Sequence, residues 1–187
     1  MWSMVNKQIS SVLMVFKSQR LLVTSILVFL PLIQMKNKTV VFPGSFDPFT
    51  KGHEYVVKKA LEIFEEVIIG IGINTSKKYL FSLEKRIAQI ESIYKENSKV
   101  KIRTYDGLTT KFCKSIDVSH IVRGLRNTID FEYEKSIAEM NFTLDKIDTV
   151  FFISRDDIGA INASIVREIF KSKGRIDSFV SYSEKLV

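Results

Sequence analysis

Hydrophobic and polar positions follow two different periods along the chain after its first 34 residues. Five short runs rich in β-branched and aromatic residues are typical of buried strands. They are Thr39–Phe42, Val67–Ile73, Val100–Thr104, Val118–Val122 and Thr149–Ile153. Between these runs, apolar residues recur every three or four positions, which is the spacing of one face of a helix. Strands separated by helices favour parallel pairing with helices on both faces. We therefore predict an α/β protein built on a five-stranded parallel sheet.

Four helical stripes support this prediction. They consist of Val57, Ala60, Leu61 and Phe64; Leu83, Ile87, Ile90 and Tyr94; Tyr133, Ile137, Met140 and Leu144; and Ile165, Val166, Ile169 and Phe170. Ser82 stands just before the second stripe and is a suitable N-cap. We expect the stripes to pack against the sheet as core faces rather than to bind a ligand.

The first 34 residues differ in composition from the rest of the chain. They contain three basic residues, no acidic residue, and a mostly apolar run over residues 21–33. This resembles a signal peptide, but no small-residue cleavage site follows and Pro31 interrupts the run. The run is also shorter than the ~20 apolar residues of a membrane-spanning helix. We expect residues 1–34 to be an extension upstream of a natural start at Met35 and outside the fold, with an interfacial anchor or a targeting segment as alternatives. The folded domain then spans residues 35–187.

Composition and charge limit the classes of protein to which the chain can belong. The chain has 187 residues, 45% of them hydrophobic, which suits one globular domain with a real core. The formal charge of +7 favours anionic partners such as phosphorylated small molecules, nucleic acid or a membrane surface. The single cysteine, Cys113, cannot form an internal disulfide, and the sequence has no Cys/His cluster with zinc spacing. A secreted disulfide scaffold and a zinc module are thus disfavoured, and a reducing compartment is the simpler interpretation.

The segment from Pro43 to His53 connects the first predicted strand to the first helical stripe. Ligands of parallel α/β sheets bind at the carboxyl ends of the strands, so this loop is a candidate site. Gly44 and Gly52 allow close backbone approach, and the start of a helix offers N–H groups to a phosphate. His53 could donate a hydrogen bond to a phosphoryl oxygen whose charge grows in a transition state, without forming a covalent intermediate. A capping or solvated histidine is the alternative for His53 considered alone.

Further polar groups follow other predicted strands. Lys77 lies after the second strand, and Arg123 and Arg126 lie after the fourth. The fold would bring these loops to one edge, where the three cations form a patch of polyphosphate size. Asn162 and Ser164 precede the last helical stripe, where they either cap the helix or hold a triphosphate.

Five segments together resemble the bacterial phosphopantetheine adenylyltransferases. They are Gly44-Ser45-Phe46-Asp47-Pro48, Thr50-x-Gly52-His53, Ser76-Lys77-Lys78, Arg123-Gly124-Leu125-Arg126 and Asp130-Phe131-Glu132-Tyr133-Glu134. The T/H-x-G-H motif by itself indicates the wider nucleotidyltransferase superfamily. The last two segments distinguish this family from the pyridine-nucleotide adenylyltransferases and the cytidylyltransferases. The resemblance covers the chain from Met35 to its end.

The resemblance implies a Rossmann-like nucleotidyltransferase domain, usually assembled as a homohexamer in the cytoplasm. Such enzymes transfer AMP from ATP, with Mg²⁺, to 4′-phosphopantetheine and release pyrophosphate. The product is dephospho-coenzyme A, so the reaction belongs to coenzyme A biosynthesis. The acceptor phosphate attacks directly in line, and no protein nucleophile takes part. The expected partners are thus ATP, 4′-phosphopantetheine and dephospho-coenzyme A or coenzyme A, without nucleic acid or membrane contact.

The same resemblance implies roles for individual residues. His53 would be catalytic, as the group that stabilises the transition state. ATP would be bound by Ser45, Phe46, His53, Gly124, Leu125, Arg126, Glu134, Ile158, Gly159, Ala160, Ile161, Asn162, Ala163 and Ser164. Phosphopantetheine would be bound by Ser45, Lys77, Thr109 and Arg123, and no protein ligand for a metal is identified.

Several features leave alternatives open. Asn162-Ala163-Ser164 replaces the family's usual run of hydroxyl residues, and Ile158 stands where an aromatic residue is common. Asp47 and Asp130 either touch substrate or orient His53 and an arginine. A related enzyme with another acceptor would share the His53 loop but differ around Lys77 and Thr109. A basic nucleic-acid-binding module is disfavoured, because the basic residues are dispersed and no helix-turn-helix or RNP pattern is present.

Overall fold

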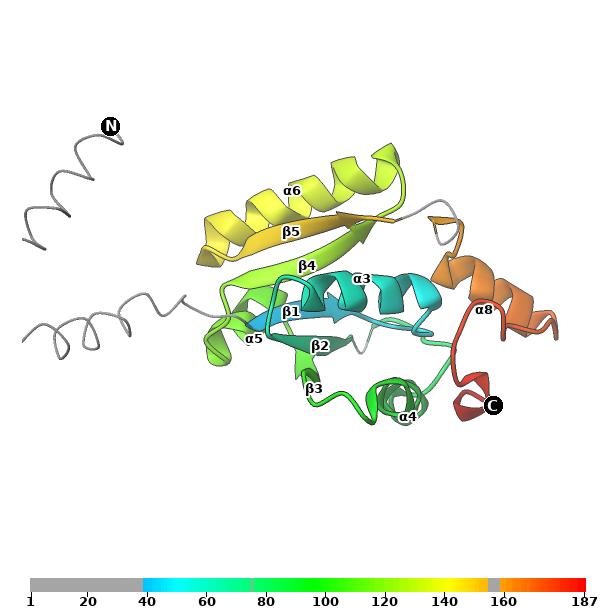
Figure 1. Ribbon diagram of the computed structural model, residues 1–187. Helices are drawn as coiled ribbons and strands as arrows, with labels where there is room; N and C mark the ends of the chain where they lie inside the picture. Colours follow the sequence, from blue (N-terminus) through cyan, green and yellow to red (C-terminus); the bar gives the residue numbers. More distant parts are fainter. Residues whose placement is uncertain (1–38, 75, 155–158) are drawn as a thin grey trace, which may run out of the picture. The chain divides into compact units, whose positions relative to one another are not determined.

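The computed structural model describes residues 39–74, 76–154 and 159–187. Its five strands are β1 (Thr39–Gly44), β2 (Glu66–Ile73), β3 (Val100–Asp106), β4 (His120–Leu125) and β5 (Asp148–Ile153). All pair in parallel in the order β3-β2-β1-β4-β5 (Figure 1). The predicted five-stranded parallel sheet is thus confirmed. The predicted extension 1–34 lies outside the described residues.

One strand is displaced from its predicted limits. The sequence predicts a strand over 118–122, whereas β4 runs from His120 to Leu125. Val118 is buried in the core but precedes the strand. Arg123 and Gly124 continue the strand because β4 keeps its pairing with β5 through Leu125. Val118 is apolar because it packs in the core, although it lies outside the strand. The limits of the strand follow from its backbone pairing with β5.

Helices connect the strands and cover both faces of the sheet. They are α3 (Lys51–Leu61), α4 (Leu83–Tyr94), α5 (Thr109–Ser115), α6 (Thr128–Asp145) and α8 (Ala163–Lys171), and a 3₁₀ turn η3 (Ser183–Lys185) follows. Ser82 caps α4 as predicted, since its side chain accepts a hydrogen bond from the N–H of Lys85. Helix α5 was not predicted from the sequence, because seven residues are too few to display a helical period.

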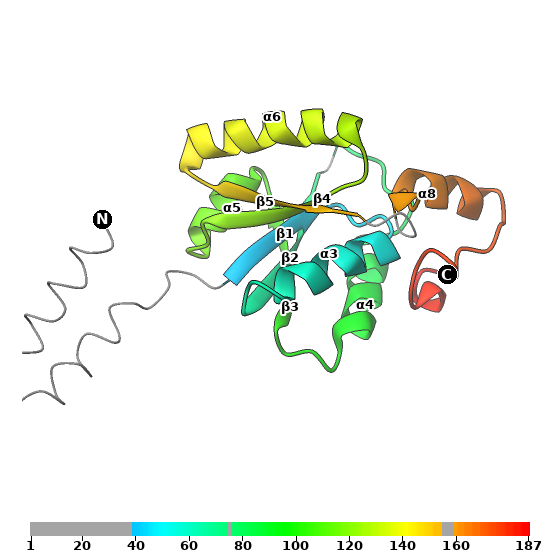
Figure 2. The same ribbon diagram turned by 45° about the horizontal axis from the view of Figure 1, so that its top comes forward.

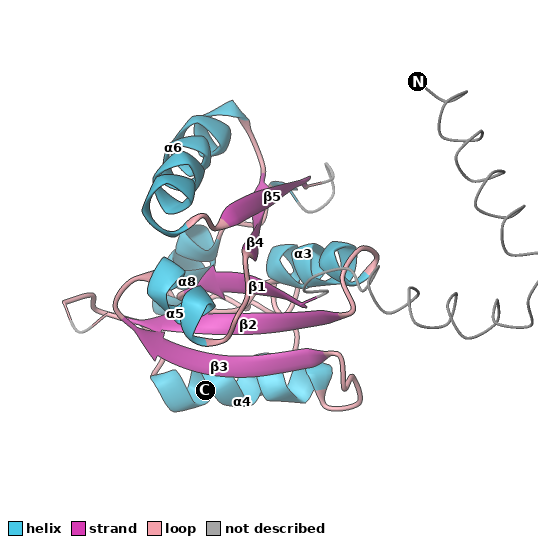
Figure 3. Ribbon diagram, turned by 90° about the vertical axis from the view of Figure 1, so that its left-hand side faces the viewer, coloured by secondary structure: helices cyan, strands magenta, loops and turns pink. Residues whose placement is uncertain are grey.

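Alternate residues of β1 point to opposite faces of the sheet. Val40 and Phe42 are buried with the α3 residue Val57 and the α4 residue Ile90. Val41 is buried on the other face with Cys113 of α5. Figures 2 and 3 show α3 and α5 on opposite sides of the strands. The period of two in a central strand therefore supplies both layers of the core.

The stripe on α6 does not form a core face, contrary to the prediction. Tyr133, Met140 and Leu144 are 68%, 64% and 59% exposed. Glu134 is instead the buried residue of this helix, which is described in full, and α6 packs against β4, β5 and α5. Helical periodicity shows that a helix has an apolar side but not which surface covers it. In the single chain this side of α6 faces outward.

The direction in which successive strands are added to the sheet changes between β1 and β4. The chain leaves β1 through α3 toward β2, and it leaves β4 through α6 toward β5 on the other side. The loops that follow β1 and β4 therefore diverge and leave a crevice at the carboxyl ends of the strands. Among the described residues, no helix has the length and apolar character needed to cross a membrane.

Candidate active site

The loop between β1 and α3 is held in place by side chains from other elements. Asp47 is buried, and its two carboxylate oxygens accept hydrogen bonds from the N–H groups of Leu80 and Phe81, each at 2.9 Å. Arg86 of α4 is 2% exposed and donates from Nη1 to the carbonyl of Ser45 at 2.5 Å. Buried backbone groups outside regular structure need such partners. Asp47 therefore holds the loop through backbone N–H groups, whereas the sequence suggested that a structural carboxylate would orient His53 or an arginine.

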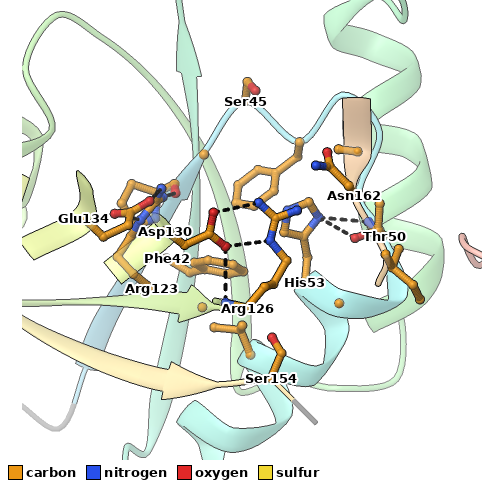
Figure 4. A pocket seen from close by; sticks show the side chains of 18 of the residues that line it. Phe42, Ser45, Thr50, His53, Arg123, Arg126, Asp130, Glu134, Ser154 and Asn162 are labelled. Carbon is orange, nitrogen blue, oxygen red and sulfur yellow. Dashed lines mark hydrogen bonds and ion pairs between the residues drawn. The ribbon is translucent and has the colours of Figure 1, made fainter. Parts of the chain in front are cut away.

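His53 lies on the first turn of α3. Its Nδ1 accepts a hydrogen bond from the backbone N–H of Thr50 at 2.9 Å (Figure 4). Because Nδ1 accepts this bond, the proton of the neutral ring is on Nε2. The rings of Phe42, Phe46 and Phe49 surround the imidazole, with centroids 5.2 to 6.0 Å away. His53 is thus a packed side chain with its Nε2–H available as a donor.

Burial and positive charge keep His53 neutral. The pKa of His53 is lowered from 6.5 to about 3, chiefly by burial and then by the charges of Arg123 and Arg126. A charged ring would lose hydration and lie near two guanidinium groups, so both causes disfavour it. Near neutral pH the ring can donate a hydrogen bond without carrying a charge. It is too weak a base to remove protons efficiently there.

Arg123 joins three elements of the site. It extends from β4, and its Nε donates to Oε2 of Glu134 on α6 at 2.8 Å. Nη2 donates to the other Glu134 oxygen, and Nη1 donates to the carbonyl of Pro43 at 2.6 Å. Such a two-bond pair fixes the plane of the guanidinium. Glu134, predicted to meet ATP, holds Arg123 against the end of β1 in this structure.

Arg126 is fixed in a similar way. Its Nε and Nη2 donate to the carboxylate of Asp130 at 2.8 and 3.0 Å, as Figure 4 shows. The hydrogen bond from Arg126 lowers the pKa of Asp130 and is the largest cause of that shift. Asn127 caps α6 by accepting a hydrogen bond from the N–H of Asp130 at 2.8 Å. Asp130 therefore orients an arginine, the second alternative that the sequence allowed.

A cavity of about 250 Å³ opens between these groups. The predicted ATP-binding residues Ser45, Phe46, His53, Gly124, Arg126, Glu134, Ile161, Asn162 and Ala163 line it. The predicted Leu125, Gly159, Ala160 and Ser164 are not among its lining residues, and Ile158 lies outside the described residues.

Two of the predicted residues that do not line the cavity, Leu125 and Ser164, make other contacts. Leu125 is buried in the sheet, and the hydroxyl of Ser164 accepts a hydrogen bond from Nη2 of Arg167 at 2.8 Å. The side chain of Asn162 caps α8, accepting a hydrogen bond from the N–H of Ser164 at 2.8 Å. Asn162 therefore combines the capping role expected by default with a place on the cavity wall.

A second cavity of about 470 Å³ lies beside the first. It is lined by all four residues predicted to bind phosphopantetheine, which are Ser45, Lys77, Thr109 and Arg123. The two cavities share Pro43, Gly44, Ser45, Arg123 and Glu134 in their walls. Two ligands could therefore approach each other at the end of β1.

Sequence reasoning missed several residues that build the site. They include Arg86 and Gln89, which support the loop after β1, and Tyr105 and Asn141, which line the second cavity. A weak signal existed for Arg86 and Gln89, because both flank the apolar stripe of α4. Long polar side chains beside a stripe are usually solvated, so the sequence alone could not indicate their burial.

The described residues contain no group of three or more His, Cys, Asp or Glu side chains that could hold a metal ion. A resident metal centre therefore has no candidate ligand set in this part of the chain.

Comparison with known proteins agrees with this geometry. The family model described as cytidylyltransferase-like matches residues 41–169, so the chain belongs to this class of α/β nucleotidyltransferases. Proteins named phosphopantetheine adenylyltransferase are similar to it over most of their length. The one from Christiangramia forsetii is 46% identical over 143 residues, covering 76% of this chain and 95% of the relative. Those from Flavobacterium johnsoniae and Cytophaga hutchinsonii are 45% and 43% identical, covering 76% and 78% of this chain and 94% and 98% of the relatives. The chain is a member of the phosphopantetheine adenylyltransferase family.

Solved structures provide a likeness of fold. A bifunctional NMN adenylyltransferase/ADP ribose pyrophosphatase from Francisella tularensis aligns with a TM-score of 0.56 at 24% identity. The same enzyme complexed with AMP and a manganese ion aligns with a TM-score of 0.57 at 22% identity. The alignments cover 74% and 81% of this chain but 43% and 48% of the longer Francisella chains. They support the Rossmann-like architecture.

Proposed function

We propose that this protein transfers the adenylyl group of ATP to 4′-phosphopantetheine, giving dephospho-coenzyme A and pyrophosphate. The observation that carries this proposal is the meeting of two cavities at Ser45 and Arg123. One contains His53 and Arg126, and the other contains Lys77 and Thr109. Membership of the phosphopantetheine adenylyltransferase family identifies the two substrates. The reaction would be a step of coenzyme A biosynthesis.

Because the His53 ring is neutral, we propose that it acts as a hydrogen-bond donor in the reaction. An oxygen of the acceptor phosphate forms a bond to the α-phosphorus of ATP while the bond from that phosphorus to the pyrophosphate oxygen breaks. The pyrophosphate leaves with the electron pair. A phosphate monoester is already ionised near pH 7, so the attack needs no general base. His53 would donate its Nε2–H to an α-phosphoryl oxygen. This hydrogen bond would stabilise the negative charge that develops on that oxygen in the transition state.

Cations near the meeting point would neutralise the phosphates. Arg126 lines the cavity assigned to ATP, while Lys77 is exposed on the wall of the acceptor cavity. The first turn of α3 adds the positive end of the helix dipole, and its residue Gly52 lines the cavity. We propose that Mg²⁺ enters with ATP, bound by phosphate oxygens as part of the substrate.

The second cavity suits the chemistry of a pantetheine arm, which combines amides with alkyl groups. Leu108, Ile137 and Leu144 contribute apolar surface to its wall. Tyr105 and Asn141 add polar groups that could meet amides.

The test is an assay with purified full-length protein, ATP, Mg²⁺ and 4′-phosphopantetheine, with products identified by mass spectrometry. We expect dephospho-coenzyme A and pyrophosphate in equal amounts. His53→Ala should lower kcat on the order of 100-fold or more, because a transition-state donor is lost. His120→Ala is the matched control, since it changes the other histidine of the chain. Absence of product from a folded, ATP-binding protein would point to another acceptor, and absence of ATP binding would overturn the proposal.

We further propose that the protein forms the homohexamer usual in its family. The outward apolar side of α6, with Tyr133 and Met140, supports self-association because large exposed apolar patches usually mark contact surfaces. Light scattering after gel filtration should give six times the chain mass. Met140→Glu should then shift the mass to smaller species, whereas a monomeric wild type would contradict the proposal.

A cytoplasmic location is also proposed, because ATP and phosphopantetheine are metabolites of that compartment. Cell fractionation of the full chain and of a chain lacking residues 1–34 provides the test. Enzyme activity in the soluble fraction for both chains is expected. Recovery of the full chain with membranes would show that residues 1–34 act as an anchor.

A further inference from the structure

Gln89 of α4 is a polar side chain with no exposed surface. Its Oε1 accepts a hydrogen bond from the N–H of Phe49 at 3.2 Å. Its Nε2 donates to the carbonyl of Phe49 and to the carbonyl of Ser181, both at 2.9 Å. One amide thus satisfies both backbone groups of a buried loop residue and reaches the C-terminal segment of the chain.

Phe49, which Gln89 holds, directly precedes Thr50, whose N–H donates a hydrogen bond to His53. Phe49 is completely buried, and the next residue, Thr50, donates its N–H to Nδ1 of His53 at 2.9 Å. The position of this N–H sets both the tautomer and the direction of the imidazole. Any displacement of Phe49 would therefore move the group that aims the Nε2–H of His53.

Other contacts hold the same loop to the same two elements. Arg86, one turn before Gln89 on α4, holds the carbonyl of Ser45 at the start of the loop. The C-terminal segment receives a hydrogen bond at the carbonyl of Phe179 from the N–H of Lys51, at 2.9 Å. Gln89 is where α4, the loop and the C-terminal segment meet.

We propose that Gln89 is a positioning residue that ties the His53 loop to α4 and to the C-terminal segment near Ser181, and so aims His53 at the transferring phosphoryl group. This proposal rests on the proposed adenylyl transfer for its kinetic consequence. Its structural consequence, a loop held through Phe49, can be measured without substrate.

The experiment compares Gln89→Met with wild type in the full-length protein. Methionine has a similar length but forms none of the three hydrogen bonds. Ser92→Ala is the matched control, because the Ser92 hydroxyl donates to the Ala88 carbonyl within α4. Two quantities are measured: kcat with the KM of each substrate, and amide hydrogen exchange of peptides covering residues 46–53 and 66–73 by mass spectrometry.

We expect kcat of Gln89→Met to fall on the order of tenfold, since small misplacements of a catalytic group are costly, while both KM values stay within about twofold. Exchange should accelerate in residues 46–53 and remain unchanged in 66–73 of β2. Ser92→Ala should behave as wild type. If Gln89→Met does not fold, Gln89→Glu replaces it, because glutamate keeps the acceptor for Phe49 but loses both donated bonds when ionised.

Three results decide the matter. Wild-type kcat and wild-type exchange in the Gln89 variant would overturn the proposal. Faster exchange spread over residues 66–73, together with unchanged kcat, would also overturn it, because Gln89 would then serve stability alone. A wild-type protein without adenylyl transfer would refute the proposed function instead, and the exchange of residues 46–53 would then decide whether Gln89 holds the loop.

Discussion

Replacing His53 by asparagine should make folding less sensitive to acid. In the native protein the pKa of His53 is lowered from 6.5 to about 3, mainly by burial and secondarily by Arg123 and Arg126. The unfolded chain therefore binds a proton at this residue below pH 6.5, while the folded chain does not. Stability contributed by the neutral ring is present above pH 6.5 and is lost as pH falls from about 6.5 to about 3.

The magnitude follows from the same shift. Each pH unit below 6.5 costs about 1.4 kcal/mol until the folded ring also binds a proton. Between pH 7 and pH 5 the wild type should lose about 2 kcal/mol through His53 alone. Asparagine at position 53 does not titrate, and its carbonyl oxygen can still accept the hydrogen bond from Thr50 that Nδ1 accepts now.

The assay is urea unfolding at pH 7 and pH 5 for wild type, His53→Asn and the control His120→Asn, at one protein concentration. Titrations of the other groups occur in both wild type and His53→Asn and cancel in the comparison of these two proteins. We expect His53→Asn to lose about 2 kcal/mol less than the wild type between the two pH values, and His120→Asn to retain the His53 contribution. Equal losses in wild type and His53→Asn would refute the inference that the His53 ring is neutral in the folded protein.

Two further predictions concern packing and acceptor binding. Gly124→Ala should lower the free energy of unfolding by about 1–3 kcal/mol, because its Cβ would lie 2.7 Å from Cγ2 of Val56 on α3. Gly159→Ala is the control in denaturant unfolding, since nothing lies within 4 Å of its added Cβ, and equal effects of the two changes would contradict the packing argument. Lys77→Ala should raise the KM for phosphopantetheine about tenfold and leave the KM for ATP unchanged, as expected for the loss of one cation from the acceptor cavity. Steady-state kinetics with each substrate varied checks this, and an increase in the KM for ATP alone would assign Lys77 to the other ligand.

The pattern of residues determined the class of fold and the loops that carry chemistry. Runs such as Val67–Ile73 are apolar throughout because a central parallel strand is covered on both faces, and that signal is local. The loop from Pro43 to His53 could be assigned to a ligand site because parallel strands all place their carboxyl ends at one edge. The resemblance to a known family then supplied the substrates and the residues that approach them.

Tertiary structure decided how those residues are held. The carboxylate of Asp47 accepts hydrogen bonds from the backbone of Leu80 and Phe81, which lie 33 and 34 positions away along the chain, so these bonds form only in the folded protein. The same holds for Gln89, whose three bonds reach residues 40 and 92 positions away along the chain.

The apolar stripe of α6 shows what helical spacing in the sequence could not predict, namely which side of the helix is buried. Its spacing is that of a core face, yet Met140 is exposed while Glu134 is buried beside Arg123. Periodicity is a property of one helix, whereas burial depends on which surfaces the whole fold brings against it. The sequence by itself therefore determined which elements form and what chemistry they carry. Contacts between elements decided which side chains are buried and which point into the site. They also keep the His53 ring neutral.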